Sequence, residues 1–230
     1  MRTKFLAEFF GTFALVFCGT GAVVFNAISV DAAHPAGAMT HIGIALVFGL
    51  VVLALIYTFG DVSGTHINPA VTLGFVAAGR FPFSSAIYYI VAQMLGAVAA
   101  SAALAWMFPV GCEVGFGATI AKPGYEWQCF VLEAFLTWFL MLVVLHVSTG
   151  AKEKGITAGI AVGAVIALEA MFAGPICGAS MNPARSFGPA LVASILATYP
   201  TYLFAPILGA LLAVPTFALT RPKADGDRHN

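Results

Sequence analysis

Charged residues are scarce in this sequence. Only 9% of its 230 residues are Asp, Glu, Lys or Arg, whereas soluble domains carry about 25%. The ten basic and ten acidic residues cancel and form no long basic run, which excludes nucleic acid as a partner. Hydrophobic residues make up 60% of the chain, and the mean hydropathy is +0.96. These values indicate a polytopic, all-α membrane protein rather than a soluble domain with a large core.

Cysteine is also scarce, with four in the chain. Neither a C-x-x-C pair nor a His at metal-ligand spacing accompanies them, so we expect no metal and no cofactor. The favoured interpretation is small apolar residues in membrane helices, while a disulfide between Cys112 and Cys129, which bracket a predicted loop, stays open. An enzyme is not expected, because the sequence shows no nucleophile–base pair or cofactor motif.

Long apolar runs dominate the chain instead. A helix crosses the ~30 Å hydrocarbon core of a bilayer with roughly 20 residues. Arg2 and Lys4 precede the first run, and Glu8 lies inside it, which favours a retained spanning helix over a cleaved signal. The six predicted spans are about 5–27, 40–60, 83–108, 128–148, 156–174 and 199–220.

The sequence contains an internal repeat. Glu8 and Glu133 are each followed four residues later by Thr, and the similar stretches "SGTHINPAVTLG" and "CGASMNPARSFG" follow the second span of each half. Because each half has three spans, the second half starts on the opposite side of the membrane, which predicts an inverted 3+3 repeat. The predicted organisation is one domain over 1–220, with repeats at about 4–108 and about 127–220, and a cytoplasmic tail at 221–230.

The basic residues set the expected orientation. Cytoplasmic loops of membrane proteins carry an excess of Lys and Arg. With the N-terminus inside, only Lys122 and Arg185 fall outside. We therefore expect a multi-pass protein of a cell membrane, inner or plasma, with both termini cytoplasmic. The residues on the cytoplasmic side would be Arg2, Lys4, Arg80, Lys152, Lys154, Arg221, Lys223 and Arg228.

Two Asn-Pro-Ala islands interrupt the apolar pattern, at Asn68, Pro69, Ala70 and at Asn182, Pro183, Ala184. Asn is a favoured N-cap, and Pro fits the first helical position because its missing N–H has no helical partner there. The islands therefore predict short helices near 69–78 and 183–193. Neither is long enough to span, and if they enter from opposite faces they meet N-terminus to N-terminus near the midplane.

The backbone before each island predicts a lumen. Non-helical backbone at that depth is tolerated only where it is buried in protein or lines a wet cavity. Each Asn oxygen would cap its own helix and leave its amide free to donate into the lumen. Two positive helix ends at one point repel cations, so the pattern predicts a pore for neutral solutes. The carbonyls expected to face this pore belong to Gly64, Thr65, His66, Gly178, Ala179 and Ser180.

These motifs resemble those of the aquaporins, the major intrinsic protein family. The resemblance covers about residues 4–220. It implies an aquaporin-like right-handed bundle of six transmembrane helices and two half-helices, and a homotetramer with one pore per subunit. It also implies that Glu8 and Glu133 hydrogen-bond the half-helix loops. The matching motifs are Glu8-x-x-Gly11-Thr12, Ser63-Gly64-x-His66-x-Asn68-Pro69-Ala70-Val71, Glu133-x-x-x-Thr137 and Gly178-x-x-x-Asn182-Pro183-Ala184-Arg185-Ser186.

The family's selectivity filter falls by resemblance on Phe48, Ala170, Ala179 and Arg185. Arg185 is expected on the outer side of the membrane, where this chain has few other basic residues. That unusual placement favours a functional role. Strict water channels of the family usually have His where Ala170 stands. We therefore expect a wider, more apolar opening for water with glycerol, urea or neutral metalloid acids, as in the nodulin-26-like branch. Ser186 and Ala190 follow the water-channel pattern, so a strictly water-selective channel stays open.

Two acids have no clear family role. Asp61 is expected near the cytoplasmic mouth, where the simplest interpretation is a solvated side chain. Glu169 neighbours Ala170, and the helical rotation of about 100° per residue should turn it partly away from the lumen. It is expected to face a subunit interface or to reach His41.

Two other classes of protein share some of these features. An ion-coupled secondary transporter also uses inverted repeats and broken helices, but it needs clustered acids at the midplane, and no third acid joins Glu8 and Glu133. An adhesive or structural membrane protein with a vestigial pore is disfavoured by the intact Asn68, Asn182 and Arg185. The expected partners are therefore the bilayer, water and small uncharged solutes.

Overall fold

A computed structural model describes residues 1–149 and 157–221, and every regular element in those ranges is helical. Six helices are long and apolar enough to cross a membrane, which confirms the six predicted spans. The predicted ends differ by at most three residues, at the start of α1 and the ends of α2 and α7. The six are α1 (Arg2–Ile28), α2 (Thr40–Ser63), α4 (Phe83–Met107), α5 (Glu126–Val147), α7 (Ala158–Cys177) and α9 (Tyr199–Thr220).

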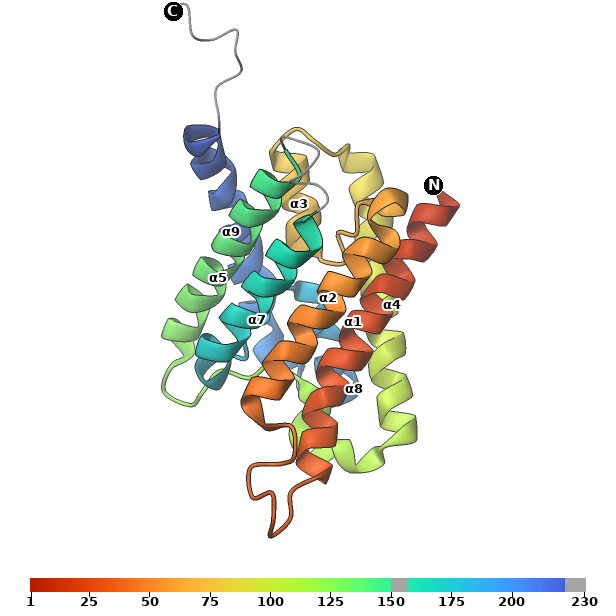
Figure 1. Ribbon diagram of the computed structural model, residues 1–230, viewed down its shortest axis with the longest axis vertical. Helices are drawn as coiled ribbons and strands as arrows, with labels where there is room; N and C mark the ends of the chain where they lie inside the picture. The colour runs from red at the N-terminus through yellow and green to blue at the C-terminus, as the bar shows by residue number, and fades with distance from the viewer. Residues whose placement is uncertain (150–156, 222–230) are drawn as a thin grey trace, which may run out of the picture.

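Two half-helices lie inside this bundle. They are α3 (Pro69–Ala77) and α8 (Pro183–Val192), each within one residue of its predicted end. Figure 1 shows α3 in the half of the bundle that holds the chain's N-terminus and α8 in the opposite half. Two short 3₁₀ segments complete the described elements, η1 (Pro109–Gly117) and η2 (Leu196–Thr198).

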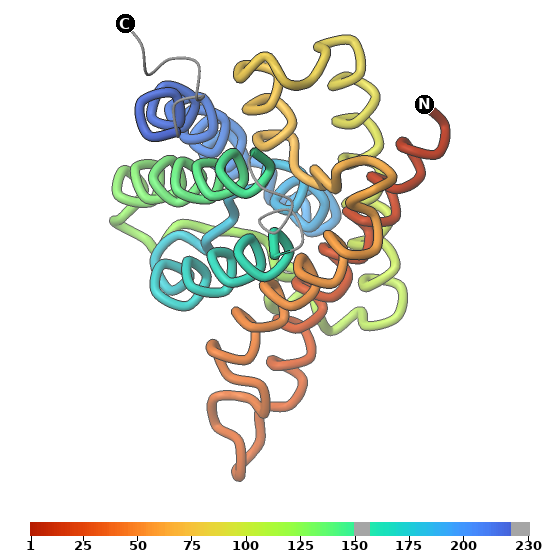
Figure 2. Tube along the Cα trace, turned by 45° about the horizontal axis from the view of Figure 1, so that its top comes forward, coloured from red at the N-terminus to blue at the C-terminus, as the bar shows by residue number. Residues whose placement is uncertain are grey.

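The packing partners repeat between the two halves. In the first repeat α1 packs against α2 and α4, and in the second α5 packs against α7 and α9. The halves are joined where α2 meets α7, side by side in Figures 1 and 2. A Cβ at Gly49 would lie 2.5 Å from the carbonyl oxygen of Gly163, so glycine alone permits this approach. Small residues at such crossings are the usual means by which membrane helices pack closely.

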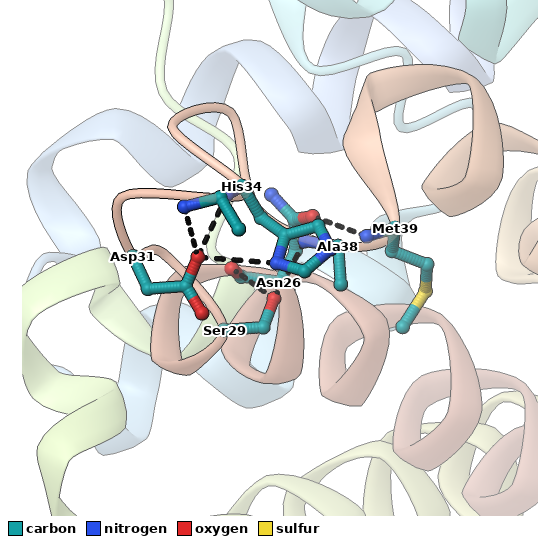
Figure 3. Close-up of polar contacts among 7 residues, drawn as sticks. Asn26, Ser29, Asp31, His34, Ala38 and Met39 are labelled. Atoms are coloured by element: carbon teal, nitrogen blue, oxygen red, sulfur yellow. Dashed lines mark hydrogen bonds and ion pairs between the residues drawn. The ribbon is translucent and has the colours of Figure 1, made fainter.

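The connection from α1 to α2 projects from the end of the bundle opposite the chain's N-terminus (Figure 2). Asn26 holds the base of this loop, because its side-chain oxygen accepts from the backbone N–H of Met39 at 3.0 Å (Figure 3). The same oxygen accepts from the backbone N–H of Thr40 at 2.8 Å. At the tip of the loop Asp31 accepts from the N–H and the ring of His34. The loop is thus folded on its own polar groups.

All four cysteines are free thiols. Cys112 is exposed and Cys129 is buried, so the disulfide left open between them does not form. Cys129 instead lies near Cys177 and Tyr202, with its sulfur 3.5 Å from the Tyr202 hydroxyl. The predicted loop after α4 is partly ordered as η1, which packs against α1, α4 and α8.

Candidate functional site

The two Asn-Pro-Ala islands begin α3 and α8 as capped helix starts. Asn68 has an extended backbone, and its side-chain oxygen accepts from the N–H of Ala70 at 2.9 Å. Asn182 accepts from the N–H groups of Ala184 and Arg185 at 3.0 and 3.3 Å. Proline at the first helical position removes one N–H that would otherwise need a partner.

Each Asn amide also binds the opposite repeat. Asn68 Nδ2 donates to the carbonyl of Met181 at 2.7 Å, and Asn182 Nδ2 donates to the carbonyl of Ile67 at 2.8 Å. The expectation that each amide is left free to donate into the lumen therefore holds at most for one of its two protons. The other is bound by a carbonyl of the opposite repeat.

The backbone before each island is held in an unusual conformation. Thr65 and Ile67 have φ of 48° and 41°, and Ala179 and Met181 have φ of 43° and 54°. The left-handed region is costly for residues with a side chain, on the order of 1–3 kcal/mol each. In both repeats the positive φ falls on every second residue, at matching positions of the loop. The two loops are therefore near copies in backbone conformation as well as in sequence.

Glu8 holds the first loop. Its carboxylate accepts from the N–H groups of His66 at 2.9 Å and Ile67 at 2.7 Å, and from the Ser63 hydroxyl at 2.6 Å. Gln93 of α4 donates a fourth bond at 2.8 Å. Glu8 is fully buried. Four donors on one carboxylate compensate for its desolvation and fix the strained backbone.

Glu133 plays the matching part in the second repeat. It accepts from the N–H groups of Ser180 at 2.7 Å and Met181 at 2.8 Å. It is also fully buried. The two glutamates therefore bind equivalent backbone positions, from α1 and from α5.

A cavity of about 130 Å³ lies between the repeats, which is room for several water molecules. Pro69, Ala70, Pro183 and Ala184 are buried outside its wall. Gly178 is half-buried, packs against Thr119 and also lies outside the wall. The remaining predicted pore residues line it: Phe48, Gly64, Thr65, His66, Asn68, Ala170, Ala179, Ser180, Asn182 and Arg185.

Arg185 is 5% exposed and is held from two sides. Its Nη1 donates to the carbonyl of Gly117 at 2.8 Å, and its guanidinium carbon lies 4.8 Å from the centre of the Phe48 ring. Gly19 of α1 makes room for that ring, since a Cβ there would lie 2.1 Å from it. Arg185 thus presents a cationic surface to the cavity, and the adjoining Phe48 presents an apolar one.

Several residues of the site escaped prediction. Gly117 belongs to η1, and no sequence pattern marks its carbonyl as the partner of Arg185. Gln93 carried a signal that was overlooked, since an amide in the middle of a spanning run needs a buried partner. The His66 ring is packed between the rings of Phe75 and Tyr89, which its loop position did not indicate.

The two unassigned acids differ. Asp61 is exposed at the end of α2, consistent with a solvated side chain. Glu169 is 1% exposed. It does not reach His41, whose Nε2 donates to the carbonyl of Met171 at 2.8 Å, and its burial within the subunit removes it from any subunit interface. Both expectations for Glu169 are wrong.

Six spanning helices and two facing half-helices around a central cavity define a membrane channel protein. The sequence profile of the major intrinsic protein family matches residues 1–217, and the chain belongs to that family. It is a passive channel for water and small solutes, not an enzyme.

Known relatives agree with this assignment. Aquaporin NIP1-1 of Zea mays is 44% identical over 218 residues, covering 95% of this chain and 74% of the relative. Nodulin-26 of Glycine max is 40% identical over 218 residues, covering 95% and 78%. The X-ray structure of the aquaglyceroporin from Plasmodium falciparum shares the fold, with a TM-score of 0.81 at 23% identity over 95% of this chain and 96% of that one.

Proposed function

We propose that the central cavity is the conduction path and that it passes water together with glycerol, urea and neutral metalloid acids. The carrying observation is the composition of the constriction, where one guanidinium faces the Phe48 ring and the remaining wall includes Ala170 and Ala179. A solute with hydroxyls on one side and carbon on the other fits such a wall, because the guanidinium donates hydrogen bonds and the apolar groups accept the carbon face.

The remaining residues of the path would serve as a ladder of partners. Carbonyls before Asn68 and Asn182 accept hydrogen bonds from the solute, and the second proton of each Asn amide donates to it. The two helix N-termini place positive potential at the same point. That potential and Arg185 together oppose protons and cations, the barrier general to aquaporin-type pores.

The names of the relatives support the solute range. The Zea mays relative is called an aquaporin, and the Plasmodium falciparum structure is that of an aquaglyceroporin. Ala170 stands where strict water channels have a large polar side chain, which favours passage of glycerol and similar solutes as well as water.

Assembly and placement follow the same reasoning. We propose a homotetramer in a cell membrane with both termini cytoplasmic. Apolar side chains are exposed on adjoining faces of α2 and α7, including Ile42, Leu50, Leu168 and Phe172. Cross-linking and light scattering of the purified protein test the tetramer, and protease access to an added C-terminal tag in sealed spheroplasts tests the orientation.

The decisive test of the solute range is stopped-flow flux in proteoliposomes under water, glycerol and urea gradients. The wild type should conduct all three with a low activation energy. Ala170→His should lower the glycerol-to-water flux ratio several-fold, because an imidazole narrows the constriction. An unchanged ratio would show that Ala170 is not part of the filter, and flux driven by a proton or sodium gradient would indicate a transporter.

A further inference from the structure

Glu169 is an acidic residue buried in the bundle whose role the pore does not explain. It is 1% exposed, and neither of its carboxyl oxygens has a hydrogen-bond partner among residues 1–149 and 157–221. It also lies outside the wall of the central cavity. Buried carboxyl groups in native proteins nearly always have partners, so a group with two unpaired oxygens requires an explanation.

The face of α7 that carries Glu169 points to α5. Cys177, two helical turns after Glu169 on the same side of α7, lies against α5, where the Cys129 sulfur is 3.9 Å from the Cys177 carbonyl. Glu133 lies on α5 one helical turn after Cys129, so Glu169 faces the helix that carries the acid of the second pore loop.

The internal repeat shows what Glu133 lacks. Gly96 of α4 lies against the carbonyl of Phe9, and Gly209 of α9 lies against the carbonyl of Ala134, so these two glycines correspond. The same register places Pro206 where the first repeat has Gln93, three residues before its glycine.

This exchange removes a donor from the second repeat. Gln93 donates to Glu8 at 2.8 Å, whereas Pro206 has neither an amide side chain nor a backbone N–H. The Ser63 hydroxyl that also binds Glu8 is matched by Cys177, whose thiol is a weak donor. Glu133 has two backbone donors and, as a side-chain donor, only the weak Cys177 thiol, whereas Glu8 has two backbone donors and the stronger Ser63 and Gln93 side chains.

The charge state of Glu169 follows from the same contacts. An unpartnered carboxylate in the membrane interior, beside a second carboxylate, is disfavoured by both desolvation and repulsion. Glu133 is the ionised member of the pair, because both its oxygens already accept from N–H groups. Glu169 then carries a proton, and a protonated carboxyl is a hydrogen-bond donor.

We propose that protonated Glu169 is a positioning residue that donates to the Glu133 carboxylate through one bridging water, replacing the donor that Gln93 gives to Glu8. A water with polar groups on both sides satisfies the two unpaired oxygens of Glu169 as well. Glu133 in turn binds the backbone N–H groups of Ser180 and Met181. The bond from Glu169 would therefore help to fix this stretch of backbone, which lines one side of the proposed conduction path.

Three variants test this assignment. Glu169→Gln keeps a donor, so it should retain wild-type flux and thermal unfolding in detergent. Glu169→Met keeps the length without a donor, so it should lower the unfolding midpoint by about 2–4 °C and reduce water flux several-fold. Adding Pro206→Gln to Glu169→Met returns an amide to the place that Gln93 occupies in the first repeat, and should restore both.

A spectroscopic readout needs no impaired variant. The infrared difference between wild type and Glu169→Gln at neutral pH should show the loss of a protonated carboxyl C=O band. Loss of an ionised carboxylate band would overturn the proposal. So would a Glu169→Met protein equal to wild type, a Glu169→Gln protein as impaired as Glu169→Met, or a double variant without recovery.

The flux readout rests on the proposed function, whereas the unfolding and infrared measurements do not. A wild type without solute flux but with the expected band and unfolding midpoints would therefore refute the proposed solute range and leave the role of Glu169 supported.

Discussion

Replacing Arg185 with Ala should make the channel leak cations. The guanidinium lines the central cavity, so an ion that passes it comes within about 5 Å of its positive charge. With an effective dielectric constant of about 20, two unit charges about 5 Å apart repel by about 3 kcal/mol. That repulsion corresponds to about a hundredfold in rate.

The assay is proton and potassium flux into proteoliposomes, measured beside glycerol flux in the same preparation. Arg185→Ala should raise cation flux by about two orders of magnitude while glycerol flux persists. Arg185→Lys is the matched control, because it keeps the charge and loses only the planar fork of donors. The reasoning fails if Arg185→Ala stays as tight to cations as wild type, or if Arg185→Lys leaks equally.

Two further outcomes concern stability. Asn182→Ala removes an N-cap and leaves the Ile67 carbonyl unpaired, so thermal unfolding should show a loss of about 2–4 kcal/mol; a loss below about 1 kcal/mol would contradict the cross-repeat bond. Gly49→Ala should destabilise the protein, because the added Cβ meets the Gly163 carbonyl, whereas Gly60→Ala on the same helix meets nothing within 4 Å and should be neutral or slightly stabilising. Equal midpoints for the two glycine variants would argue against the close α2–α7 approach.

The local rules of helix formation predicted the framework of this protein. Run length and apolarity located the spans, and Asn followed by Pro located the starts of α3 and α8 to the residue. These features depend on neighbours in the chain, which a sequence displays directly.

The contacts between distant segments could not be predicted in the same way. The Met181 and Ile67 carbonyls accept from amides that are 113 and 115 residues away. Nothing local marks those carbonyls, and capping alone explained each Asn. The Gly117 carbonyl was missed for the same reason, since its role depends on how η1 folds over Arg185.

Glu169 shows a different limit. Its helix could be predicted, and its rotation away from the lumen followed from helical geometry. Its surroundings depend on which helix packs against that side of α7. The prediction selected His41 of α2, whereas this side of α7 lies against α5. The register between α4 and α9 was needed before the loss of the Gln93 counterpart could be noticed.

The exchange of amide bonds between Asn68 and Asn182 has a consequence for biogenesis. A ribosome that has delivered only the first repeat leaves the Ile67 carbonyl and one proton of the Asn68 amide without protein partners inside the bilayer. Neither group is satisfied until α8 has entered from the other face. Assembly of the channel is therefore completed late in synthesis, and the two repeats produced as separate chains should each persist only when both are made in the same cell.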